Sequence, residues 1–439
     1  MNSVGTMFSR VFRREKESEV ILGKVANSIL KKAKLSEREL NHHVHIVGAS
    51  GFGKTVLLSH LIEQRIAQGK GLLFLDLKGD VDTIEKFRSY AEKAKRAEDV
   101  QILSLGHESI SSPYNLLGTG TPTQIRDRIM IALNWSEEFY KNQASSFLLK
   151  LLIGLCWLRD QAGEKLDIFS LLDALSNRDT IENACMRIPE NNLEVRRCLE
   201  EVVTSARSPD YWNSLQGLRT QIESLVLSDF GALIRSHEEG IDLFESVTKS
   251  KIILIFLDTR RYGETAKTIG RFVLQDLKAV SAKIDSEVSK IDRRPFSVII
   301  DEFADLAQED FIAFLDRARS SRMSVVVAHQ ELSDLQRISP EFAGRLMGNT
   351  ATVFAFLQKG GDSAETLASI AGTKTVTKKT ERHSRQFFFD VGTGETSIRE
   401  TEEYVIHPNV IKSLGIGECI CIKKYPRASA FRVEVFREN

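Results

Sequence analysis

An eight-residue glycine-rich segment has the composition and spacing that phosphate chemistry requires. Residues 48–55 read Gly-Ala-Ser-Gly-Phe-Gly-Lys-Thr and fit the pattern G-x-x-x-x-G-K-[ST]. Glycines let successive backbone N–H groups converge on a phosphate, and a following helix adds its positive N-terminal dipole. Lys54 is expected to reach the β- and γ-phosphates, and the Thr55 hydroxyl is expected to ligate Mg²⁺. The segment therefore predicts a site for ATP and Mg²⁺, whose loop consists of Gly48, Ala49, Ser50, Gly51, Phe52 and Gly53.

An apolar run that ends in two acids complements this glycine loop. Phe296–Ile300 is followed directly by Asp301 and Glu302. Two adjacent acids at the end of so apolar a run are unfavourable unless a cation uses them. Asp301 is expected to hold the Mg²⁺ shell through water, and Glu302 to orient or activate the attacking water as a general base. The alternative is a pair of surface acids at a strand end.

A polar residue follows the next apolar run along the chain. Gln330 comes two residues after Ser324–Ala328. Polar residues at the carboxyl ends of parallel strands meet at the crevice where ligands bind. Gln330 is therefore expected to sense the γ-phosphate or to help position water, the alternative being an ordinary turn residue.

Three arginines, Arg317, Arg319 and Arg322, lie between the acidic run and Gln330. In ring-shaped P-loop machines an arginine from a neighbouring subunit can enter the nucleotide site, where it is worth about 10³–10⁵ in rate. Apolar residues at 311, 312 and 315 predict a helix that ends near Arg319. We expect Arg319 to emerge beside the next strand, at the carboxyl edge of the sheet. A solvated helix face is the alternative for any one of these arginines.

The elements around these residues alternate between strand and helix patterns. Val44–Val47 reads as a strand, Thr55–Gln68 as a helix, and Leu72–Leu75 as the next strand. Further strand patterns occupy residues 251–257, 296–300, 324–328 and 352–356. Such alternation predicts an α/β fold with a mainly parallel sheet and right-handed crossovers.

Between about residues 120 and 245 the strand patterns disappear. Helical patterns occupy residues 124–134, 137–159, 170–175, 180–188, 193–206 and 211–234. Ser170 and Thr180 are plausible N-caps of two of these helices. We therefore expect an all-α insertion at 120–245 within a discontinuous ATPase domain formed by 41–119 and 246–439.

Residues 1–40 are expected to form a basic N-terminal lead-in. The first 34 residues carry eight Lys or Arg against three acids. A solvated segment is one interpretation, and contact with an anionic membrane or a membrane partner is the other. Because Lys+Arg and Asp+Glu both count 60 in the 439 residues, any anionic partner must be held by local patches.

The composition also limits the compartment. No apolar run reaches the ~18 residues that a membrane-spanning helix needs. The five cysteines are odd in number and fit reduced thiols better than a disulfide framework. These features predict a cytoplasmic protein.

Several motifs together resemble those of a known family, the type IV secretion coupling proteins. These are the TraD/TraG-like ATPases of conjugation, within the FtsK/HerA group of RecA-like motors. The resemblance covers residues 44 to about 430 and includes the helical insertion. Its motifs are the P-loop, Leu75–Asp80, Ile300–Phe303, Arg319–Gln330, Gly348–Thr350 and Tyr404–Pro408.

The resemblance implies a RecA-like P-loop ATPase that works as a homohexameric, ATP-driven DNA translocase. It would receive DNA–relaxase complexes and pass them to a type IV secretion channel. The insertion then corresponds to the family's all-α domain, associated with DNA and relaxosome recognition, and Arg319 falls where the family carries its candidate finger. DNA contacts are expected to be independent of sequence, because a translocase relies on the nucleic-acid backbone.

The sequence departs from the family in one respect and leaves two other functions open. Many coupling proteins begin with two transmembrane helices, whereas this sequence shows none. Membrane contact is therefore expected only through partners or the basic N-terminus, at the inner face of the cell membrane. The other functions are a HerA/FtsK-like DNA motor outside secretion and a substrate-recruiting receptor ATPase. The basic segment Lys374–Arg385 is a candidate phosphate contact or a solvated hairpin.

Overall fold

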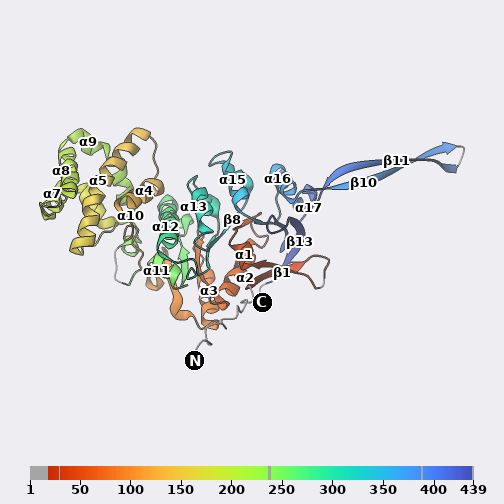
Figure 1. The fold of residues 1–439 in the computed structure, drawn as a ribbon, viewed down its shortest axis with the longest axis horizontal. Helices are drawn as coiled ribbons and strands as arrows, with labels where there is room; N and C mark the ends of the chain where they lie inside the picture. The colour runs from red at the N-terminus through yellow and green to blue at the C-terminus, as the bar shows by residue number, and fades with distance from the viewer. Residues whose placement is uncertain (1–17, 29, 236–238, 387–388, 438–439) are drawn as a thin grey trace, which may run out of the picture.

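A computed structural model describes residues 18–28, 30–235, 239–386 and 389–437, with the backbone alone at 379–398. Its centre is an 11-stranded sheet (Figure 1). Strands β9, β3, β8, β7, β4, β6 and β5 are parallel neighbours, whereas β2, β1, β13 and β12 extend the sheet in antiparallel fashion beyond β9. In this spatial order the strands are β2 (Lys32–Ser36), β1 (Glu19–Val25), β13 (Ser429–Val435), β12 (Glu418–Lys423), β9 (Thr352–Ala355), β3 (Val44–Val47), β8 (Met323–His329), β7 (Phe296–Ile300), β4 (Gly71–Asp76), β6 (Ile252–Phe256) and β5 (Val100–Ser104).

The parallel strands are covered by helices on both faces. Leu72 and Phe74 of β4 belong to a core that also contains side chains of α2 (Lys54–Ala67) and α3 (Val81–Lys93). Leu73 and Leu75 point to the opposite face, where α12 (Thr259–Glu287) and α13 (Phe311–Ala318) contribute to a second core. Burial on both faces explains why these strands read as continuous apolar runs. The predicted α/β fold with a mainly parallel sheet is confirmed.

A group of helices occupies the end of the molecule farthest from the long hairpin (Figure 1). Its apolar side chains join the core beneath α12 and α13 without interruption. A buried ion pair crosses the same junction, because Arg128 of α4 lies 2.6 Å from Asp276 of α12. The helices are α4 (Pro122–Ala132), α5 (Glu138–Ala162), α6 (Ile168–Ser176), α7 (Arg178–Arg187), α8 (Leu193–Arg207), α9 (Pro209–Ser214) and α10 (Gln216–Val226).

The helix starts and one helix end differ from the sequence expectation. Asp167, not Ser170, caps α6, and Ser170 completes a capping box as the third helical residue. Asn177, not Thr180, caps α7. The expected helix 211–234 is broken into α9, α10 and a short 3₁₀ turn, Gly231–Ile234. Helix α10 ends at Val226 with Leu227 as its C-cap, and just beyond it the Ser228 hydroxyl donates to the Leu225 carbonyl at 2.7 Å.

Residues 18–40 are part of the main sheet rather than a lead-in. Strand β1 pairs with β2 and with the C-terminal strand β13, and helix α1 (Glu37–Leu40) follows. Val20 and Leu22 are at most 1% exposed, because their alternation along β1 turns both into the core. Residues 1–17, which hold four of the eight basic residues counted in the first 34, lie outside the described residues.

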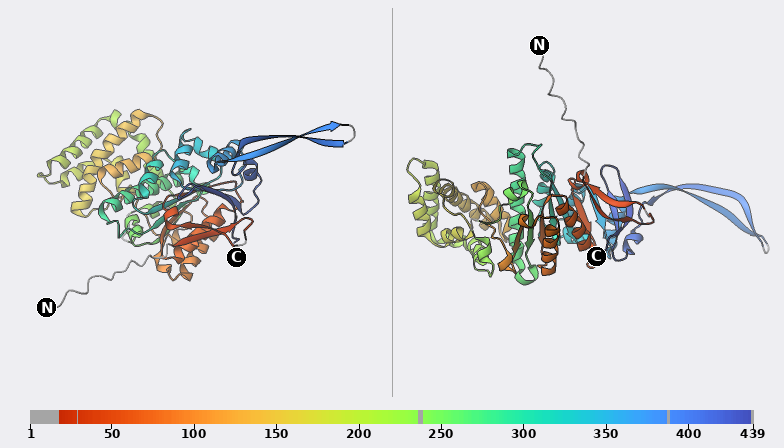
Figure 2. Two further views of the ribbon diagram at one scale, coloured as in Figure 1. Left: turned by 45° about the vertical axis from the view of Figure 1, so that its right-hand side comes forward. Right: turned by 90° about the horizontal axis from the view of Figure 1, so that it is seen from below.

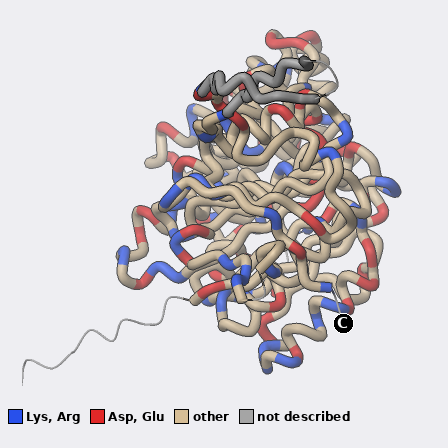
Figure 3. The backbone as a smooth tube through the Cα atoms, turned by 90° about the vertical axis from the view of Figure 1, so that its right-hand side faces the viewer, with Lys and Arg blue, Asp and Glu red and all other residues tan. Residues whose placement is uncertain are grey.

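A long hairpin of β10 (Thr373–Gln386) and β11 (Phe389–Tyr404) projects from the body of the molecule (Figure 2). The basic segment Lys374–Arg385 lies on β10, and at the hairpin base Lys378 pairs with Glu403 at 2.7 Å. The structure does not describe the side chains of residues 379 to 398. Most of the basic side chains of the predicted phosphate contact therefore lie outside the described residues. Seen from the hairpin side, acidic and basic residues are interspersed along the backbone (Figure 3).

The remaining helices of the chain are short and connect strands or follow them. They are α11 (Leu243–Thr248), α14 (Leu332–Gln336), α15 (Phe342–Asn349), α16 (Gly361–Ala371) and α17 (Pro408–Lys412). Among the residues that the structure describes, none of these or the other helices combines the length and the apolar character needed to cross a membrane.

Candidate nucleotide site

The glycine loop joins the end of β3 to the start of α2. Gly51 and Gly53 adopt φ of +82° and +107°, a region that favours glycine. At Gly48 the requirement is space, because a Cβ there would lie 2.4 Å from Cβ of Phe356. Gly53 is the N-cap of α2 and offers no side-chain cap, so the first N–H groups of the helix stay available to an anion.

Lys54 is held inside this loop. Its side chain is 5% exposed, and Nζ donates to the carbonyl oxygens of Gly48 at 2.6 Å and Ala49 at 3.2 Å. Burial lowers the pKa of Lys54, while the carboxylates of Glu302 and Asp301 oppose that shift. Thr55 follows in the first turn of α2 and lines the adjoining cavity.

The strand order brings the other predicted residues to the same edge of the sheet. Strand β8 lies between β3 and β7, and all three run parallel. The glycine loop, Gln330 and the pair Asp301–Glu302 therefore leave the sheet at its carboxyl edge. The Gln330 amide lies 3.4 Å from the Glu302 carboxylate. Asp301 is 1% exposed, and Glu302 adopts a left-handed φ of 54° that places its backbone N–H 3.0 Å from Asp301 Oδ1.

Lys78 bridges the two acids, a contact that no sequence motif assigned. Its Nζ lies 3.1 Å from Asp301 Oδ2 and 3.0 Å from Glu302 Oε1. Burial would lower the pKa of Lys78, but the two carboxylates outweigh burial and raise it. Burial would likewise raise the pKa of Glu302, but Lys78 and Gln330 bring it below its usual value. Lys78 and Glu302 therefore stay charged at neutral pH.

The turn after β4 explains how Lys78 reaches these acids. The Asp76 carboxylate accepts hydrogen bonds from the backbone N–H groups of Lys78 at 3.1 Å and Gly79 at 3.0 Å. Gly79 adopts φ of +70° and packs on Asp258, where a Cβ would come within 2.5 Å. Burial and the nearby Asp301 raise the pKa of Asp76 to about 6. The signal in the sequence was an acid at the end of an apolar run followed by Lys-Gly.

The oxygen groups at this edge fit a magnesium ion. The Thr55 hydroxyl and the Asp301 carboxylate are hard oxygen ligands, and the ammonium of Lys78 against Asp301 shows that this carboxylate is placed to meet a cation. Within the described ranges, no group of three or more His, Cys, Asp or Glu side chains converges on a common point. A site with few protein ligands suits Mg²⁺, which keeps water and phosphate oxygens in its shell.

A cavity of about 680 Å³ lies beside the loop, within the ~300–1,000 Å³ range of small-molecule sites. Ser50, Thr55 and Lys78 line it on the loop side. The C-terminal strands supply the opposite wall, Ile416–Glu418 and Glu434–Arg437. This wall is fixed to the loop, because the Gly417 N–H donates to the Phe52 carbonyl at 3.0 Å. Sequence reasoning missed the wall, since no local pattern marks it.

Arg319 lies at the amino edge of the sheet, so the expectation that it emerges at the carboxyl edge is wrong. It precedes β8, and its guanidinium contacts Nε2 of His42, just before β3, at 2.7 Å. The crossover through α13 must return the chain to the start of the next parallel strand, which places the end of α13 at the amino edge. Arg322 is bound to the Arg293 carbonyl at 2.9 Å, and Arg317 is exposed.

The structure thus brings Lys54, Thr55, Asp301, Glu302 and Gln330 to one edge and leaves Arg319 at the other.

Two family models match the chain. The model described as the TraM recognition site of TraD and TraG matches residues 295–415, and the helicase HerA-like C-terminal model matches residues 23–130. The first interval contains Asp301, Glu302, Arg319 and Gln330, and the second contains the glycine loop.

One curated relative is the type 4 coupling protein DotL of Legionella pneumophila. It is 22% identical over an alignment of 395 positions, which covers 77% of this chain and 50% of DotL. The chain spans about half the length of the curated relatives that it matches.

Solved structures share the fold at low identity. The conjugative coupling protein TrwBdeltaN70 has a TM-score of 0.69 at 15% identity, covering 95% of this chain and 89% of that one. TrwB in complex with ADP and Mg²⁺ has a TM-score of 0.65 at 16% identity, covering 92% and 87%. VirB4 of Thermoanaerobacter pseudethanolicus has a TM-score of 0.51 at 15% identity, covering 95% and 96%.

Proposed function

We propose that this relative of the type IV coupling proteins is an ATP-hydrolysing DNA translocase that delivers DNA and its bound relaxase to a type IV secretion channel. One observation carries the proposal. The segment that matches the TraD and TraG model also supplies the two acids and the glutamine beside the P-loop. A family-specific region and a nucleotide site therefore share the same strands.

ATP with Mg²⁺ is the proposed cofactor. TrwB, which shares the fold, has been solved with ADP and Mg²⁺. Backbone N–H groups of residues 48–53 and Lys54 would bind the phosphates, and Thr55 and Asp301 would hold the metal. Bound Mg²⁺ supplies positive charge against the β- and γ-phosphate oxygens. Lys54 would exchange its two carbonyl partners for phosphate oxygens, which are stronger acceptors.

Glu302 is the proposed general base. Its carboxylate is kept ionised by Lys78, so it can orient the attacking water and accept its proton. Gln330 bonds the same carboxylate and lies at the end of the strand between the acids and the glycine loop. A change in the contact between Gln330 and the γ-phosphate would therefore shift the Glu302 carboxylate, which Gln330 also contacts.

Arg319 is proposed to act on a neighbouring subunit within a homohexamer. It lies at the opposite edge of the sheet from Glu302, so it has no route to the site of its own subunit. Its side chain is exposed and is oriented by His42, which accepts a hydrogen bond from the guanidinium and stacks on Tyr425 at 4.0 Å. An oriented arginine at the surface is suited to enter a partner's site.

We propose that residues 120–245 form the recognition domain inserted into the ATPase domain of 41–119 and 246–439. DNA would be held through its backbone without sequence readout, and the protein partners would be relaxosome and channel components. The protein would work at the inner face of the cell membrane and reach it through partners or through the basic residues at its N-terminus.

A HerA-like DNA motor outside secretion is the second candidate, and the match of residues 23–130 to the HerA-like model favours it. Both candidates predict ATP hydrolysis that DNA stimulates. They differ in partners, because only a coupling protein should bind a relaxase encoded in the same genome.

The test is ATP hydrolysis by the purified chain without DNA and with single-stranded or duplex DNA of several sequences. We expect stimulation by DNA, with little dependence on sequence, and loss of hydrolysis in Lys54→Ala. Relaxase binding, measured on the same preparation, separates the coupling protein from the HerA-like motor. Hydrolysis that no DNA stimulates would contradict both and favour a receptor ATPase.

A further inference from the structure

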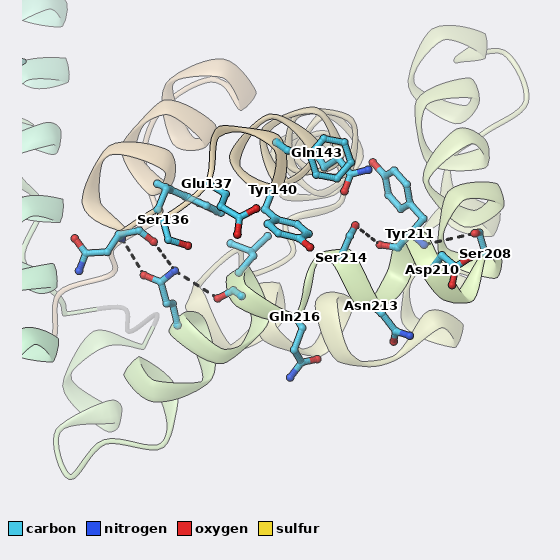
Figure 4. Close-up of a pocket in the computed structure, with 16 residues that line it drawn as sticks. Ser136, Glu137, Tyr140, Gln143, Ser208, Asp210, Tyr211, Asn213, Ser214 and Gln216 are labelled. Carbon is cyan, nitrogen blue, oxygen red and sulfur yellow. Dashed lines mark hydrogen bonds between the residues drawn. The ribbon is translucent and has the colours of Figure 1, made fainter.

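A second cavity, of about 810 Å³, lies among the helices of the insertion and has no part in the nucleotide site. Figure 4 shows Glu137 and Tyr140, at the start of α5, facing the segment from Ser208 to Gln216 across the cavity. Its volume falls in the upper part of the ~300–1,000 Å³ range of small-ligand sites. It can accept several side chains of a polypeptide.

The walls of this cavity are held in place before any ligand arrives. Asn134 and Gln221 exchange two hydrogen bonds of 2.9 Å, which tie the segment before α5 to α10. The indole N–H of Trp135 donates to the Met130 carbonyl at 2.8 Å, and the Ser214 hydroxyl donates to the Tyr211 carbonyl at 2.6 Å. Such pre-organisation lowers the entropy that binding must overcome.

The wall combines aromatic faces with amide groups. Trp135, Tyr140 and Tyr211 line the cavity, and Phe139 at its rim is 64% exposed. Gln143 is also in the wall, and among the described residues its Oε1 atom has no hydrogen-bond donor. Aromatic faces accept apolar and cationic side chains, whereas amides pair with a peptide backbone.

The charge of the cavity has a single sign. The ionisable side chains in the wall include two acids, Glu137 and Asp210, and no Lys or Arg. Within the described part of the chain, neither acid forms an ion pair, and Glu137, although it is the N-cap of α5, makes no capping hydrogen bond. Both carboxylates are therefore available to a cationic ligand.

We propose that this cavity binds an extended, basic peptide segment, with apolar side chains against the aromatic wall and Lys or Arg side chains against Glu137 and Asp210. That the segment belongs to a transported or accessory protein rests on the proposed function, whereas the chemistry of the ligand rests on the cavity alone. The cavity would then select cargo, at the opposite end of the molecule from the long hairpin.

Nucleic acid is the less suitable ligand. Proteins that hold single strands combine aromatic stacking with a basic groove that follows the phosphates. Here the aromatic groups are present, but the wall carries carboxylates where phosphates would lie. Like-charge contact would oppose a phosphate backbone.

The test is binding of short fluorescein-labelled Gly/Ser peptides to the full chain, followed by fluorescence anisotropy without nucleotide. One peptide carries two arginines that flank a leucine, and the other carries two aspartates in their place. We expect the arginine peptide to bind and the aspartate peptide not to bind. The double variant E137Q/D210N should bind the arginine peptide about tenfold more weakly, about 1.4 kcal/mol at 25 °C.

The matched control is D179N/E194Q, which makes the same change of charge on exposed residues outside the cavity. It should bind like the unmodified chain. Equal binding of both peptides, no binding of either, or equal weakening by the two double variants would overturn the proposal. The proposal would also be overturned if labelled single-stranded DNA bound more tightly than the arginine peptide and that binding disappeared in E137Q/D210N. Because the assay contains no ATP, its result is independent of the ATPase test above.

Discussion

The two edges of the parallel sheet differ in what they contain. At the carboxyl edge the charged groups are buried or half-buried and have partners within the chain, with Lys78 between Asp301 and Glu302 and Lys54 held by loop carbonyls. At the amino edge, Arg319 is exposed and donates a hydrogen bond to His42, whose ring stacks on Tyr425. At the carboxyl edge the charged groups pair with one another within the subunit, whereas the amino edge presents a charged group at the surface.

The difference follows from chain topology. Every crossover between parallel strands starts at the carboxyl edge and returns at the amino edge, so loops after strands gather on one side and loops before strands on the other. A single subunit therefore cannot bring Arg319 to Glu302. On our account the hydrolytic site becomes complete only where the amino edge of one subunit meets the carboxyl edge of the next.

The largest effect should come from Lys54→Ala. It removes the charge that faces the β- and γ-phosphates and leaves the loop carbonyls of Gly48 and Ala49 without their donor. We expect no detectable hydrolysis and weakened ATP binding, measured by phosphate release and by a fluorescent nucleotide. Hydrolysis at the wild-type rate would contradict the assignment of the nucleotide site to the carboxyl edge.

Arg319→Ala should lower hydrolysis by about 10³–10⁵, the range of arginine fingers, while ATP binding stays normal. Arg322→Ala is the control, because Arg322 is already bound to the Arg293 carbonyl, and its effect should be much milder. A severe loss in Arg322→Ala together with a normal Arg319→Ala would transfer the role to Arg322.

Glu302→Gln should lower turnover by about 10²–10⁴, since an amide cannot accept the proton of water. The variant should still bind ATP, because Asp301 and the loop are unchanged. Glu309→Gln is a matched control that should turn over normally, because Glu309 lies in the same segment between β7 and α13 and pairs with Arg345 at 3.0 Å. Normal turnover by Glu302→Gln would place the base elsewhere.

Arg128→Met should destabilise the chain by about 3–5 kcal/mol, because it leaves the buried carboxylate of Asp276 without its ion-pair partner. Arg126→Met, two residues away on α4, loses only a partly exposed pair with Asp127 and should cost about 0–1 kcal/mol. Urea unfolding of both variants measures the difference. Equal stability would show that this junction does not hold the insertion to the sheet.

Ile416→Asp should weaken nucleotide binding by about tenfold. A tenfold change in Kd corresponds to about 1.4 kcal/mol, near the free energy that burying one apolar side chain contributes. Ile416 is 80% exposed on the C-terminal wall of the nucleotide cavity. Ile291→Asp, 92% exposed and outside the cavity lining, is the control. Unchanged binding by Ile416→Asp would mean that the nucleotide does not use this wall.

The sequence was informative where function depends on local backbone geometry. The glycine loop between Val47 and Lys54 needs left-handed φ at Gly51 and Gly53, and few residue types permit that. Strands such as Phe296–Ile300 were visible because both faces are buried and every residue except Ser297 is apolar. The carboxyl edge, with Asp301, Glu302 and Gln330, followed from these strands.

Prediction was weaker where position depends on distant contacts. The C-terminal wall at Ile416 reaches the glycine loop through a hydrogen bond to Phe52, more than 350 residues away in sequence. Strand β1 lies between β2 and β13, and β13 is at the far end of the chain, so no local pattern reveals this pairing. Arg319 lies at the amino edge because the crossover through α13 returns the chain to the start of β8, and the edge reached depends on this direction rather than on local residue types.

The most direct test of the account is hydrolysis by mixed assemblies of Arg319→Ala and Glu302→Gln subunits. In a mixed ring, some interfaces pair an intact Arg319 from the Glu302→Gln subunit with an intact Glu302 from the Arg319→Ala subunit. The account predicts that mixing equal amounts restores activity well above that of either variant alone. Mixed assemblies no more active than the separate variants would contradict the claim that the two edges complete one site between neighbouring subunits.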